Sequence, residues 1–372
     1  MNTDWAQFRD TRKHKGFNPY ENVLNTGTVA LIDKDAFLTT GAAVNSSSAV
    51  VGGVVYVGSD DGNVYALTTA AQLWTFPTGS AVASSPAVAG GVVYVGSYDG
   101  NVYALNAATG AKLWAFPTGA AVFSSPAVAN AVVYVGSNDG NVYALNAATG
   151  AKLWAFPTGA AVESSPAVLA GVVYVGSDDG NVYALNAATG AKLWSFPTGS
   201  FVISSPAVAN GVVYAGSLDG NVYALNAATG AKLWNFTTGA GIQSAPAVAY
   251  GAVYIGSNDG NLYALNAATG ARLWNFTTGN AVISSPVVAD GVVYAGSYDG
   301  NLYALSAATG ARLWSYATGS AVFSSPAVAN GVVYAGSGDH TLYAFDLAGG
   351  QAAPARPART SLHPNYRLQE QR

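Results

Sequence analysis

The stretch VVYVGSNDGNVYALNAATGAKLWAFPTGAAVESSPAV, from Val132 to Val168, recurs along most of the chain with few changes. Each copy carries one tyrosine at the end of its VVY-like triplet, and this residue gives the spacing of the copies. The tyrosines are Tyr56, Tyr94, Tyr134, Tyr174, Tyr214, Tyr254, Tyr294 and Tyr334, with a first step of 38 residues and later steps of 40. A fixed period near forty residues is typical of solenoids, arrays and propellers, so the content of one copy decides between them.

Each copy is predicted to form four short strands separated by turns. In the third copy the strands are expected at 124–129, 131–137, 141–145 and 151–156. Asp139-Gly140 favours a hairpin, because Gly reaches positive φ and Asp bonds nearby backbone amides. The strands are apolar on both faces and show no helical period, as expected for sheets that are covered on both sides. The pattern predicts an all-β fold of four-stranded antiparallel blades around an axis.

The segment from Ala144 to Trp154, ALNAATGAKLW, resembles the tryptophan-docking motif A-x-D/N-x-x-T-G-x-x-x-W of the eight-bladed quinoprotein dehydrogenase propellers. The chain is thus similar to the PQQ-like (quinoprotein alcohol dehydrogenase-like) repeat family, and this resemblance implies eight blades. It also implies that each tryptophan packs on the neighbouring blade, where a buried indole removes a large apolar area from water. The predicted docking residues are Trp74, Trp114, Trp154, Trp194, Trp234, Trp274 and Trp314.

The two ends of the repeat array complement each other. Residues 28–41 align with the fourth strand of a blade and end in Thr40-Gly41, whereas the last copy, residues 324–347, has only three strands. The N-terminal strand is therefore predicted to complete the eighth blade and close the ring, which removes exposed sheet edges. It carries Asp35 and Ala36 where the repeats carry Leu-Trp, so a weaker blade is expected there.

The predicted organisation is an N-terminal segment (1–27), an eight-bladed propeller (28–349) and a flexible tail (350–372). The first segment resembles the W-x-x-F-R segment ahead of many propellers of the family, and Trp5, Phe8 and Phe17 are expected to hold it against the ring. The tail is rich in Pro and Arg and has no apolar period, which is typical of a solvated terminus.

Composition limits the possible partners. Half of the 372 residues are hydrophobic and 9% are charged, the net charge is −4, and there is no cysteine to form a disulfide or a thiolate metal site. Four spread arginines in the tail would release few counterions, so no nucleic-acid partner is expected. No signal peptide and no membrane span is expected either. The chain is predicted to be a monomer. Its compartment stays open, because the resemblance implies an extracytoplasmic protein and the lack of a signal peptide a cytoplasmic one.

The resembling dehydrogenases hold pyrroloquinoline quinone over Ca²⁺ with Asp, Glu and Asn side chains, an Arg near the quinone, a stacking tryptophan and commonly a vicinal disulfide. None of these groups can be placed here: every tryptophan except Trp5 has the docking position, and the innermost strands carry no acid or arginine. His14, His340 and His363 form no ligand spacing. An active site also needs different groups in different roles, which near-identical blades do not supply. We therefore expect no catalytic residue, no cofactor and no metal site.

Every copy carries one aspartate at the same position of its hairpin turn. The set is Asp61, Asp99, Asp139, Asp179, Asp219, Asp259, Asp299 and Asp339. Each could bond its own turn amides, or the ring could form a face for cations or a basic partner together with Asp60, Asp178 and Glu163. Single carboxylates lack the six or more oxygens that Ca²⁺ prefers, so the first interpretation is favoured. Lys112 and its equivalents follow the opposite turn, which predicts a disc with two differently charged faces.

Two positions vary among copies that otherwise agree, one in the hairpin turn and one before the Ser-Ser-Pro segment. Both lie at the same end of a four-stranded blade, so they are predicted to share one face. Large apolar side chains on a face that met only water would be costly, which favours a binding surface. The binding-face candidates are Asn45, Asp60, Tyr98, Phe123, Asn138, Glu163, Asp178, Ile203, Leu218, Gln243, Asn258, Ile283, Tyr298 and Phe323.

Three functions remain as hypotheses. The first is a non-catalytic scaffold that binds a protein or peptide of unknown identity on the variable face. The second is multivalent glycan binding, with Tyr98, Tyr298, Asn138 and Asn258 as stacking and hydrogen-bonding groups. The third is a degenerate PQQ-dependent dehydrogenase. Near-identity of the copies also fits a recently amplified or consensus-like repeat protein without a defined activity.

Overall fold

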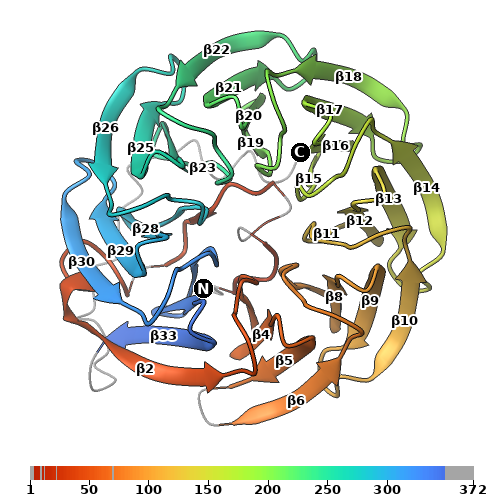
Figure 1. The fold of residues 1–372 in the computed structure, drawn as a ribbon, viewed down its shortest axis with the longest axis horizontal. Helices are drawn as coiled ribbons and strands as arrows, with labels where there is room; N and C mark the ends of the chain where they lie inside the picture. The colour runs from red at the N-terminus through yellow and green to blue at the C-terminus, as the bar shows by residue number, and fades with distance from the viewer. Residues whose placement is uncertain (1–3, 9–10, 12, 22, 69–70, 348–372) are drawn as a thin grey trace.

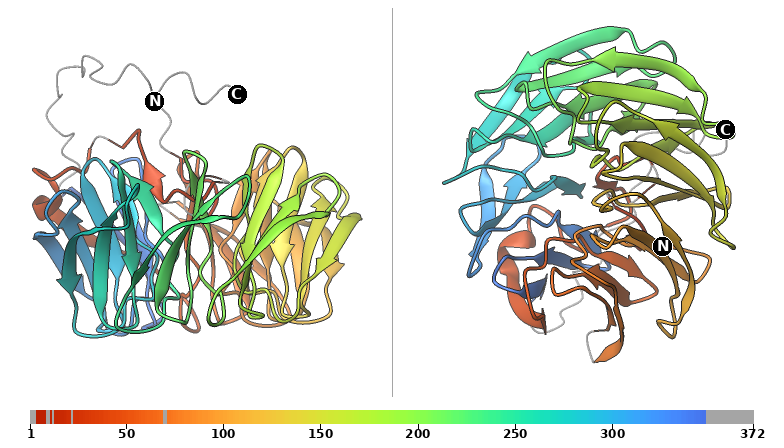
Figure 2. Two further views of the ribbon diagram at one scale, coloured as in Figure 1. Left: turned by 90° about the horizontal axis from the view of Figure 1, so that it is seen from above. Right: turned by 45° about the vertical axis from the view of Figure 1, so that its right-hand side comes forward.

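Eight sheets, each built on four antiparallel strands, surround a central axis in the structure, a computed structural model that describes residues 4–8, 11, 13–21, 23–68 and 71–347. Figure 1 looks along this axis and shows the sheets as blades of a closed ring, in chain order from red to blue. In the side view of Figure 2 the strands run between the two faces of a disc. The prediction of an all-β, eight-bladed propeller is therefore confirmed.

The strands fall into four layers from the axis outward. The innermost are β3 (Ala49–Val51), β7 (Ala87–Ala89), β11 (Ala127–Ala129), β15 (Ala167–Leu169), β19 (Ala207–Ala209), β23 (Ala247–Ala249), β27 (Val287–Ala289) and β31 (Ala327–Ala329). The second are β4 (Val54–Gly58), β8 (Val92–Gly96), β12 (Val132–Gly136), β16 (Val172–Gly176), β20 (Val212–Gly216), β24 (Ala252–Gly256), β28 (Val292–Gly296) and β32 (Val332–Gly336). The third are β5 (Asn63–Leu67), β9 (Asn101–Asn106), β13 (Asn141–Asn146), β17 (Asn181–Asn186), β21 (Asn221–Asn226), β25 (Asn261–Asn266), β29 (Asn301–Ser306) and β33 (Thr341–Leu347). The outermost are β6 (Gln72–Pro77), β10 (Lys112–Pro117), β14 (Lys152–Pro157), β18 (Lys192–Pro197), β22 (Lys232–Thr237), β26 (Arg272–Thr277), β30 (Arg312–Ala317) and β2 (Ile32–Thr39).

Two short elements precede this array, strand β1 (Phe17–Asn18) and the 3₁₀ turn η1 (Val29–Leu31). In the described part of the chain no helix has the length and apolar character needed to cross a membrane. The two faces of the disc are named here by their turns. The aspartate face carries the Asp-Gly turns and the blade-to-blade links, such as 138–140 and 158–163. The lysine face carries the first turns and the Ala-Ala-Thr-Gly turns, such as 130–131 and 147–150.

The innermost strands are shorter than expected. In the third blade β11 covers only Ala127–Ala129, so the prediction of a strand over 124–129 was wrong at its start. Ser124 and Ser125 bond groups in other strands and blades, and Pro126 has no N–H to donate to a sheet ladder. The link therefore reaches the axis before the strand begins.

Strand β2 closes the ring as predicted, because it pairs antiparallel with β33 and supplies the fourth strand of the eighth blade. The register differs from the expected one. Alignment on Thr40-Gly41 puts Ala36 at the tryptophan position, but the pairing places Asp35 opposite Ala344, as Trp314 lies opposite Ala304. The cause is the irregularity in the ladder, which falls between Ala36 and Leu38 and not just before the tryptophan position as in the repeats.

The N-terminal segment winds around the lysine-face end of the central channel. It bonds the innermost strands in blade order: Trp5 pairs with Val50 of the first blade, and Val88, Val208, Val248 and Val288 donate their N–H groups to the carbonyls of Ala6, Lys13, Lys15 and Gly16. Asn18 then reaches the eighth blade through its side chain, which donates to the Val328 carbonyl (2.8 Å). The segment thus satisfies backbone groups that a bare channel wall would leave exposed.

A ring of serine hydroxyls joins the blades at the axis. The N–H of Ser85 donates to the Ser125 hydroxyl (2.9 Å), and the N–H of Ser125 donates to the Ser165 hydroxyl (2.9 Å). The same bond closes the circle between Ser325 and Ser47 (3.0 Å). The sixth blade interrupts it, because that position is Ala245, which has no hydroxyl to accept from Ser205.

Replacing Ala245 with Ser is expected to stabilise the protein by about 0.5–1.5 kcal/mol, since it supplies the missing acceptor at a buried site. The free energy of unfolding in urea is the measurement, and Ser125→Ala is the matched control, with a loss of similar size. An unchanged or lower stability of the Ala245→Ser variant would contradict the view that the missing hydroxyl at this position costs stability.

The docking tryptophans join each blade to the next one. The indole N–H of Trp154 donates to the carbonyl of Ala187 (3.0 Å), and the hydroxyl of Tyr134 donates to the same carbonyl (3.1 Å). The indole lies flat on Gly190, where a Cβ would come within 2.8 Å of the ring. Gly190 also has a φ of 73°, so both the close approach and the backbone conformation require glycine here.

The seam between the seventh and eighth blades lacks this arrangement within the described part of the chain. Trp314 packs edge-on against Phe345, with ring centroids 5.0 Å apart, and it is less buried than Trp154. The hydroxyl of Tyr294 is fully buried and finds no hydrogen-bond partner among the described residues. A buried hydroxyl without a partner is costly, so the closing blade is held less well than the others.

Candidate binding face

Backbone bonds bring the two variable positions together on the aspartate face. The N–H of Tyr98, in the turn of the second blade, donates to the carbonyl of Ala81 in the link that leads into that blade (2.9 Å). The N–H of Leu218 bonds the Phe201 carbonyl in the same way (2.9 Å). Because this bond recurs around the ring, turn residues and link residues alternate along one circle.

Side chains also meet across the blade boundaries. The ring of Tyr98 packs against Phe123, which belongs to the link into the next blade, with centroids 4.0 Å apart. Tyr298 and Phe323 repeat this contact in an edge-on arrangement at 4.6 Å. Tyr298 is exposed, with 44% of its surface in contact with water. All other binding-face candidates are partly buried, like Phe123. These apolar side chains therefore keep part of their surface in water.

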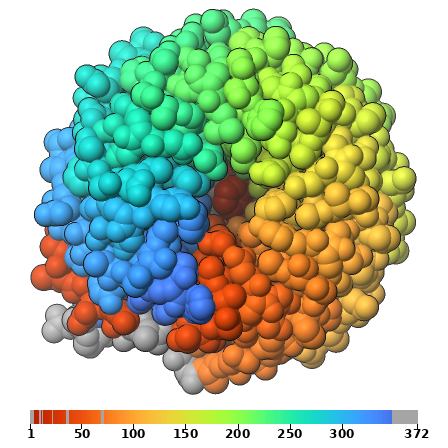
Figure 3. All heavy atoms as spheres, viewed as in Figure 1, coloured from red at the N-terminus to blue at the C-terminus, as the bar shows by residue number. Residues whose placement is uncertain are grey.

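The circle surrounds a hollow at the axis. Figure 3 shows this hollow, and the dark-red atoms of the N-terminal segment fill its bottom. Since that segment lies at the lysine-face end of the channel, the view is onto the aspartate face. The variable side chains thus lie around a recess that is closed at its far end.

The aspartates of the hairpin turns are fully engaged within the fold. One oxygen of Asp139 accepts from the backbone N–H (2.9 Å) and side chain (3.0 Å) of Asn141. The other accepts from the N–H of Gly119 (2.7 Å), in the preceding link, and from the hydroxyl of Tyr143 (2.7 Å). Each carboxylate therefore joins its own turn, by hydrogen bonds, to the link that comes from the preceding blade.

These bonds also set the charge state of the turn aspartates. Burial raises the pKa of Asp139, but the hydrogen bonds from Gly119, Tyr143 and Asn141 outweigh it and leave the pKa below its ordinary value of 3.8. The pKa is lowered in the same way at Asp61, Asp99, Asp179, Asp219, Asp259, Asp299 and Asp339.

A carboxyl group whose pKa is lower in the folded state stabilises the fold above its unfolded pKa, and this stability is lost as the pH falls through the folded value. Eight such groups predict a steep fall of the free energy of unfolding as the pH drops below about 4. The measurement is urea unfolding at a series of pH values, and the same series on Asp139→Asn should show a shallower fall. Stability that did not change over this range would contradict the prediction.

Three further acids of this face, Asp60, Glu163 and Asp178, have a different environment. Burial raises the pKa of Asp60, although Asn45 donates to its carboxylate at 2.6 Å. Burial also raises the pKa of Glu163, against a hydrogen bond from Asn138. The pKa of Asp178 rises to about 6, first through burial and then through the charges of Glu163 and Asp179. These carboxylates are thus less well compensated than the turn aspartates.

A third variable position was missed in the sequence, although comparing the residue before Gly-Val-Val among the copies would have found it. It lies in the first turn, on the lysine face, and is occupied by Gly52, Gly90, Asn130, Ala170, Asn210, Tyr250, Asp290 and Asn330. All of these residues have positive φ, which Gly and Asn adopt readily and Tyr does not. Tyr250 is therefore held in a strained conformation, at a φ of 51°.

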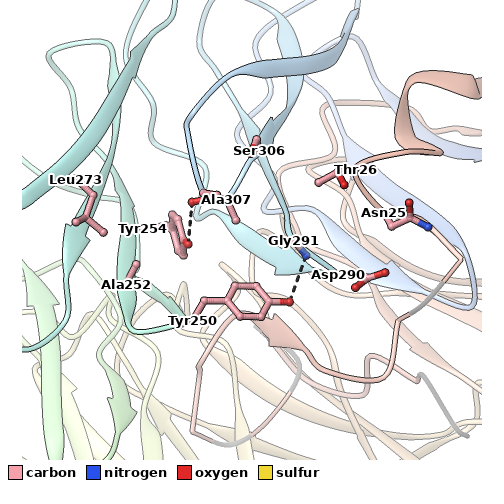
Figure 4. Close-up of a pocket in the computed structure, with 11 residues that line it drawn as sticks. Asn25, Thr26, Tyr250, Ala252, Tyr254, Leu273, Asp290, Gly291, Ser306 and Ala307 are labelled. Atoms are coloured by element: carbon pink, nitrogen blue, oxygen red, sulfur yellow. Dashed lines mark hydrogen bonds between the residues drawn. The ribbon is translucent and has the colours of Figure 1, made fainter. Parts of the chain in front are cut away.

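Tyr250 lines a groove of about 520 Å³ between the sixth and seventh blades, which Figure 4 shows in close-up. Its hydroxyl accepts from the N–H of Gly291 (3.2 Å), and its ring packs edge-on against Phe17 of β1 at 5.3 Å. A groove of about 700 Å³ lies at the equivalent place between the first two blades, where Gly90-Gly91 take the place of Asp290-Gly291. The groove thus occurs at more than one blade boundary. At this one, the contact between Tyr250 and Phe17 holds the N-terminal segment beside the groove.

Of the two described histidines, His340 lies on this face and His14 does not. His14 is fully buried in the N-terminal segment and meets Phe8 edge-on at 5.5 Å, whereas His340 lies in the last hairpin turn with a φ of 71°. His363 and the tail lie outside the described residues. Within the described ranges no group of three or more His, Cys, Asp or Glu side chains could hold a metal ion.

The sequence profile of a propeller family described as outer membrane protein assembly factor BamB matches residues 22–161, 138–241 and 218–363. The chain belongs to this BamB-like family. The family resemblance inferred from the docking motif is therefore confirmed. No curated protein sequence matches the chain.

Solved structures of BamB-like and quinoprotein propellers share the fold. BamB from Moraxella catarrhalis superposes with a TM-score of 0.75 at 22% identity, over 85% of this chain and 99% of that one. A computationally designed protein, Ika8, gives 0.76 at 21% identity, over 84% and 98%. Quinohemoprotein alcohol dehydrogenase from Comamonas testosteroni gives 0.80 at 17% identity, over 95% and 82%. At these identities the likeness shows the fold alone.

Proposed function

We propose that this BamB-like propeller is a monomeric, non-catalytic scaffold that binds a protein or peptide segment across its aspartate face. One observation carries the proposal: the positions that vary among near-identical blades hold half-buried apolar and aromatic side chains, such as Phe123, Ile203 and Phe323, on one circle of the aspartate face. A blade that needed only to fold could carry the same residue there in every copy. Apolar surface that is kept partly in water and is rimmed by polar groups is typical of binding sites.

The glycan hypothesis has less support from the same contacts. The ring of Tyr98 already packs against Phe123 at 4.0 Å, and the Asn138 side chain already bonds Glu163. These groups are therefore partly engaged within the fold, although Tyr298 is exposed and the Oδ1 atoms of Asn138 and Asn258 find no hydrogen-bond partner among the described residues. The dehydrogenase hypothesis draws only on a shared fold, which hosts several unrelated activities.

The test is selection from a phage-displayed library of random linear peptides, with the purified propeller as the target. In one variant Phe123, Ile203, Ile283 and Phe323 are changed to Ser, which removes apolar surface from the aspartate face. In the control variant Leu113, Leu153, Leu193 and Leu233, which lie on the outer strands and are 51–53% exposed, are changed to Ser. The parent and the control should retain peptides that the first variant retains at least about tenfold less well.

Equal retention by all three proteins, or no peptide retained by the parent, would contradict the proposal. Both variants should unfold as cooperatively as the parent, since none of the changed side chains is fully buried. A glycan array probed with the parent tests the second hypothesis in parallel.

A further inference from the structure

In the described part of the chain, the turns that carry the aspartate-face carboxylates hold one histidine, His340, and no lysine or arginine. The described lysines and arginines stand at the start of the outer strands, next to the lysine face, in the N-terminal segment, or on β2. Among the described residues, none lies in an Asp-Gly turn or in a link. Each of the eight turn aspartates accepts three or four hydrogen bonds within the fold, for example four at Asp139 and three at Asp219. Asp60, Glu163 and Asp178 add negative charge with fewer donors.

Glu163 and Asp178 form the least compensated pair. They belong to the link and the turn of the fourth blade, and each burial-raised pKa shows that the charged form is disfavoured. One oxygen of Asp178 is buried and has no hydrogen-bond partner among the described residues. Two carboxylates held together in this way weaken the fold unless something positive lies between them.

The same chain shows that the fold does not need these charges. In the sixth blade the equivalent positions hold Gln243 and Asn258, the neutral amides of the same shape, and the blade is otherwise closely similar. The charged pair in the fourth blade is therefore a local addition whose charge costs stability and which the blade architecture does not require, although Glu163 accepts a hydrogen bond from Asn138 of the third blade. A charge of this kind is expected where it serves binding.

The pair has an apolar side chain on one side and, beyond the Asn138 amide, an aromatic pair on the other. On one side, beyond Asn138, lie Phe123 and Tyr98 with their rings 4.0 Å apart. On the other side the repeat geometry puts Ile203 next to Asp178, as it puts Phe123 next to Tyr98. A divalent metal ion prefers six or more oxygen ligands, whereas a lysine or arginine side chain brings an aliphatic stem that suits apolar neighbours.

We propose that Glu163 and Asp178 receive a lysine or arginine side chain of a partner protein segment, whose flanking apolar residues pack on Phe123 and Ile203. This inference rests on the proposed function and names the chemistry of the partner. An ammonium or guanidinium group would donate to both carboxylates in charge-assisted hydrogen bonds, which are the stronger kind. The partner segment is thus expected to read apolar–basic–apolar.

The test uses peptides selected on the parent propeller, synthesised with a fluorescent label, and measured by fluorescence polarisation. Glu163→Gln with Asp178→Asn gives the fourth blade the pair that the sixth blade carries already, so the variant is expected to fold. It should bind the peptides at least about tenfold more weakly than the parent. Asp33→Asn, which neutralises an exposed acid on the outer strand β2 and away from this face, is the control and should bind within about twofold of the parent.

The peptide supplies the second half of the experiment. Replacing its lysine with norleucine, or its arginine with citrulline, should weaken binding to the parent by a similar factor and should not weaken binding to the Gln/Asn variant further. Adding CaCl₂ should not displace the bound peptide from the parent propeller. The Gln/Asn variant should also melt above the parent temperature at pH 7.5 and lose this gain at pH 4, because Asp178, with a pKa of about 6, is charged only at the higher pH.

Selected peptides without a basic residue, or an unchanged affinity of the Gln/Asn variant, would overturn this inference. If such peptides were still lost from the variant with four serines, the recognition face would stand and only the cation site would fail. Competition of CaCl₂ with the peptide for the parent would instead assign the pair to a metal ion. If the parent retains no peptide at all, the proposed function fails together with the inference.

Discussion

A chain that begins at Ala42 is expected to lose its cooperative unfolding as a monomer. The truncation removes β2, which pairs with β33 along its whole length, from Ile32 opposite Leu347 to Thr39 opposite Thr341. It also removes the N-terminal segment from the channel. The edge of β33 is then free to pair with another chain. The loss is comparable to the whole net stability of a domain, about 5–15 kcal/mol. Light scattering after size-exclusion chromatography and a thermal melt are the measurements.

A shorter truncation separates the two contributions. A chain that begins at Tyr20 keeps β2 but lacks Trp5, Phe17 and Asn18, which bond or pack against the ring. It is expected to stay monomeric and to melt at a lower temperature than the full chain. If the chain from Ala42 stays monomeric with the melting temperature of the full chain, then the closing strand does not hold the ring together.

Changing Trp154 to Ala is expected to destabilise the protein by about 3–5 kcal/mol, the usual cost of removing a large buried aromatic side chain. The indole is only 9% exposed, covers Gly190 and donates to the Ala187 carbonyl, so the cavity opens at a boundary between two blades. The free energy of unfolding in urea is the measurement. Gly190→Ala should be similarly harmful, since its Cβ would lie 2.8 Å from the indole.

Trp314→Ala is the matched control for this prediction. Trp314 is the same residue in the same motif, but it is more exposed and donates no indole hydrogen bond among the described residues. Its replacement is expected to cost about half as much as that of Trp154, within the range for partly buried aromatic residues. Equal losses at the two sites would show that the seam is as well packed as the other blade boundaries.

The sequence was sufficient to predict the ring because the signals that define a blade are local and repeated. Asp139-Gly140 selects a hairpin, Trp154 selects a neighbour, and a unit copied at a fixed spacing has to repeat the same contacts. The pairing of the N-terminal strand with the incomplete last blade also followed from the two ends. The position of Asp35 opposite Ala344 did not follow, because it depends on where the ladder irregularity falls, and spacing does not reveal that.

The candidate face could be predicted only in part. That the turn and link residues share one face followed from the strand order, whereas the contact between Tyr98 and Phe123 across a blade boundary required the structure. The path of the N-terminal segment along the channel could not be predicted either, because it lacks the repeat and makes its bonds mainly through the backbone. For the same reason the variable first turn with Tyr250 gained its meaning only beside Phe17.

The path of the N-terminal segment has a consequence for the evolution of the gene. Repeats as similar as these recombine readily, so their number can change between generations. A protein with seven or nine copies would still hold β2 and β33 at its two ends and could close a smaller or larger ring. The segment would then no longer fit, because its bonds advance blade by blade from Trp5 to Asn18. It therefore acts as a molecular ruler that favours rings of eight.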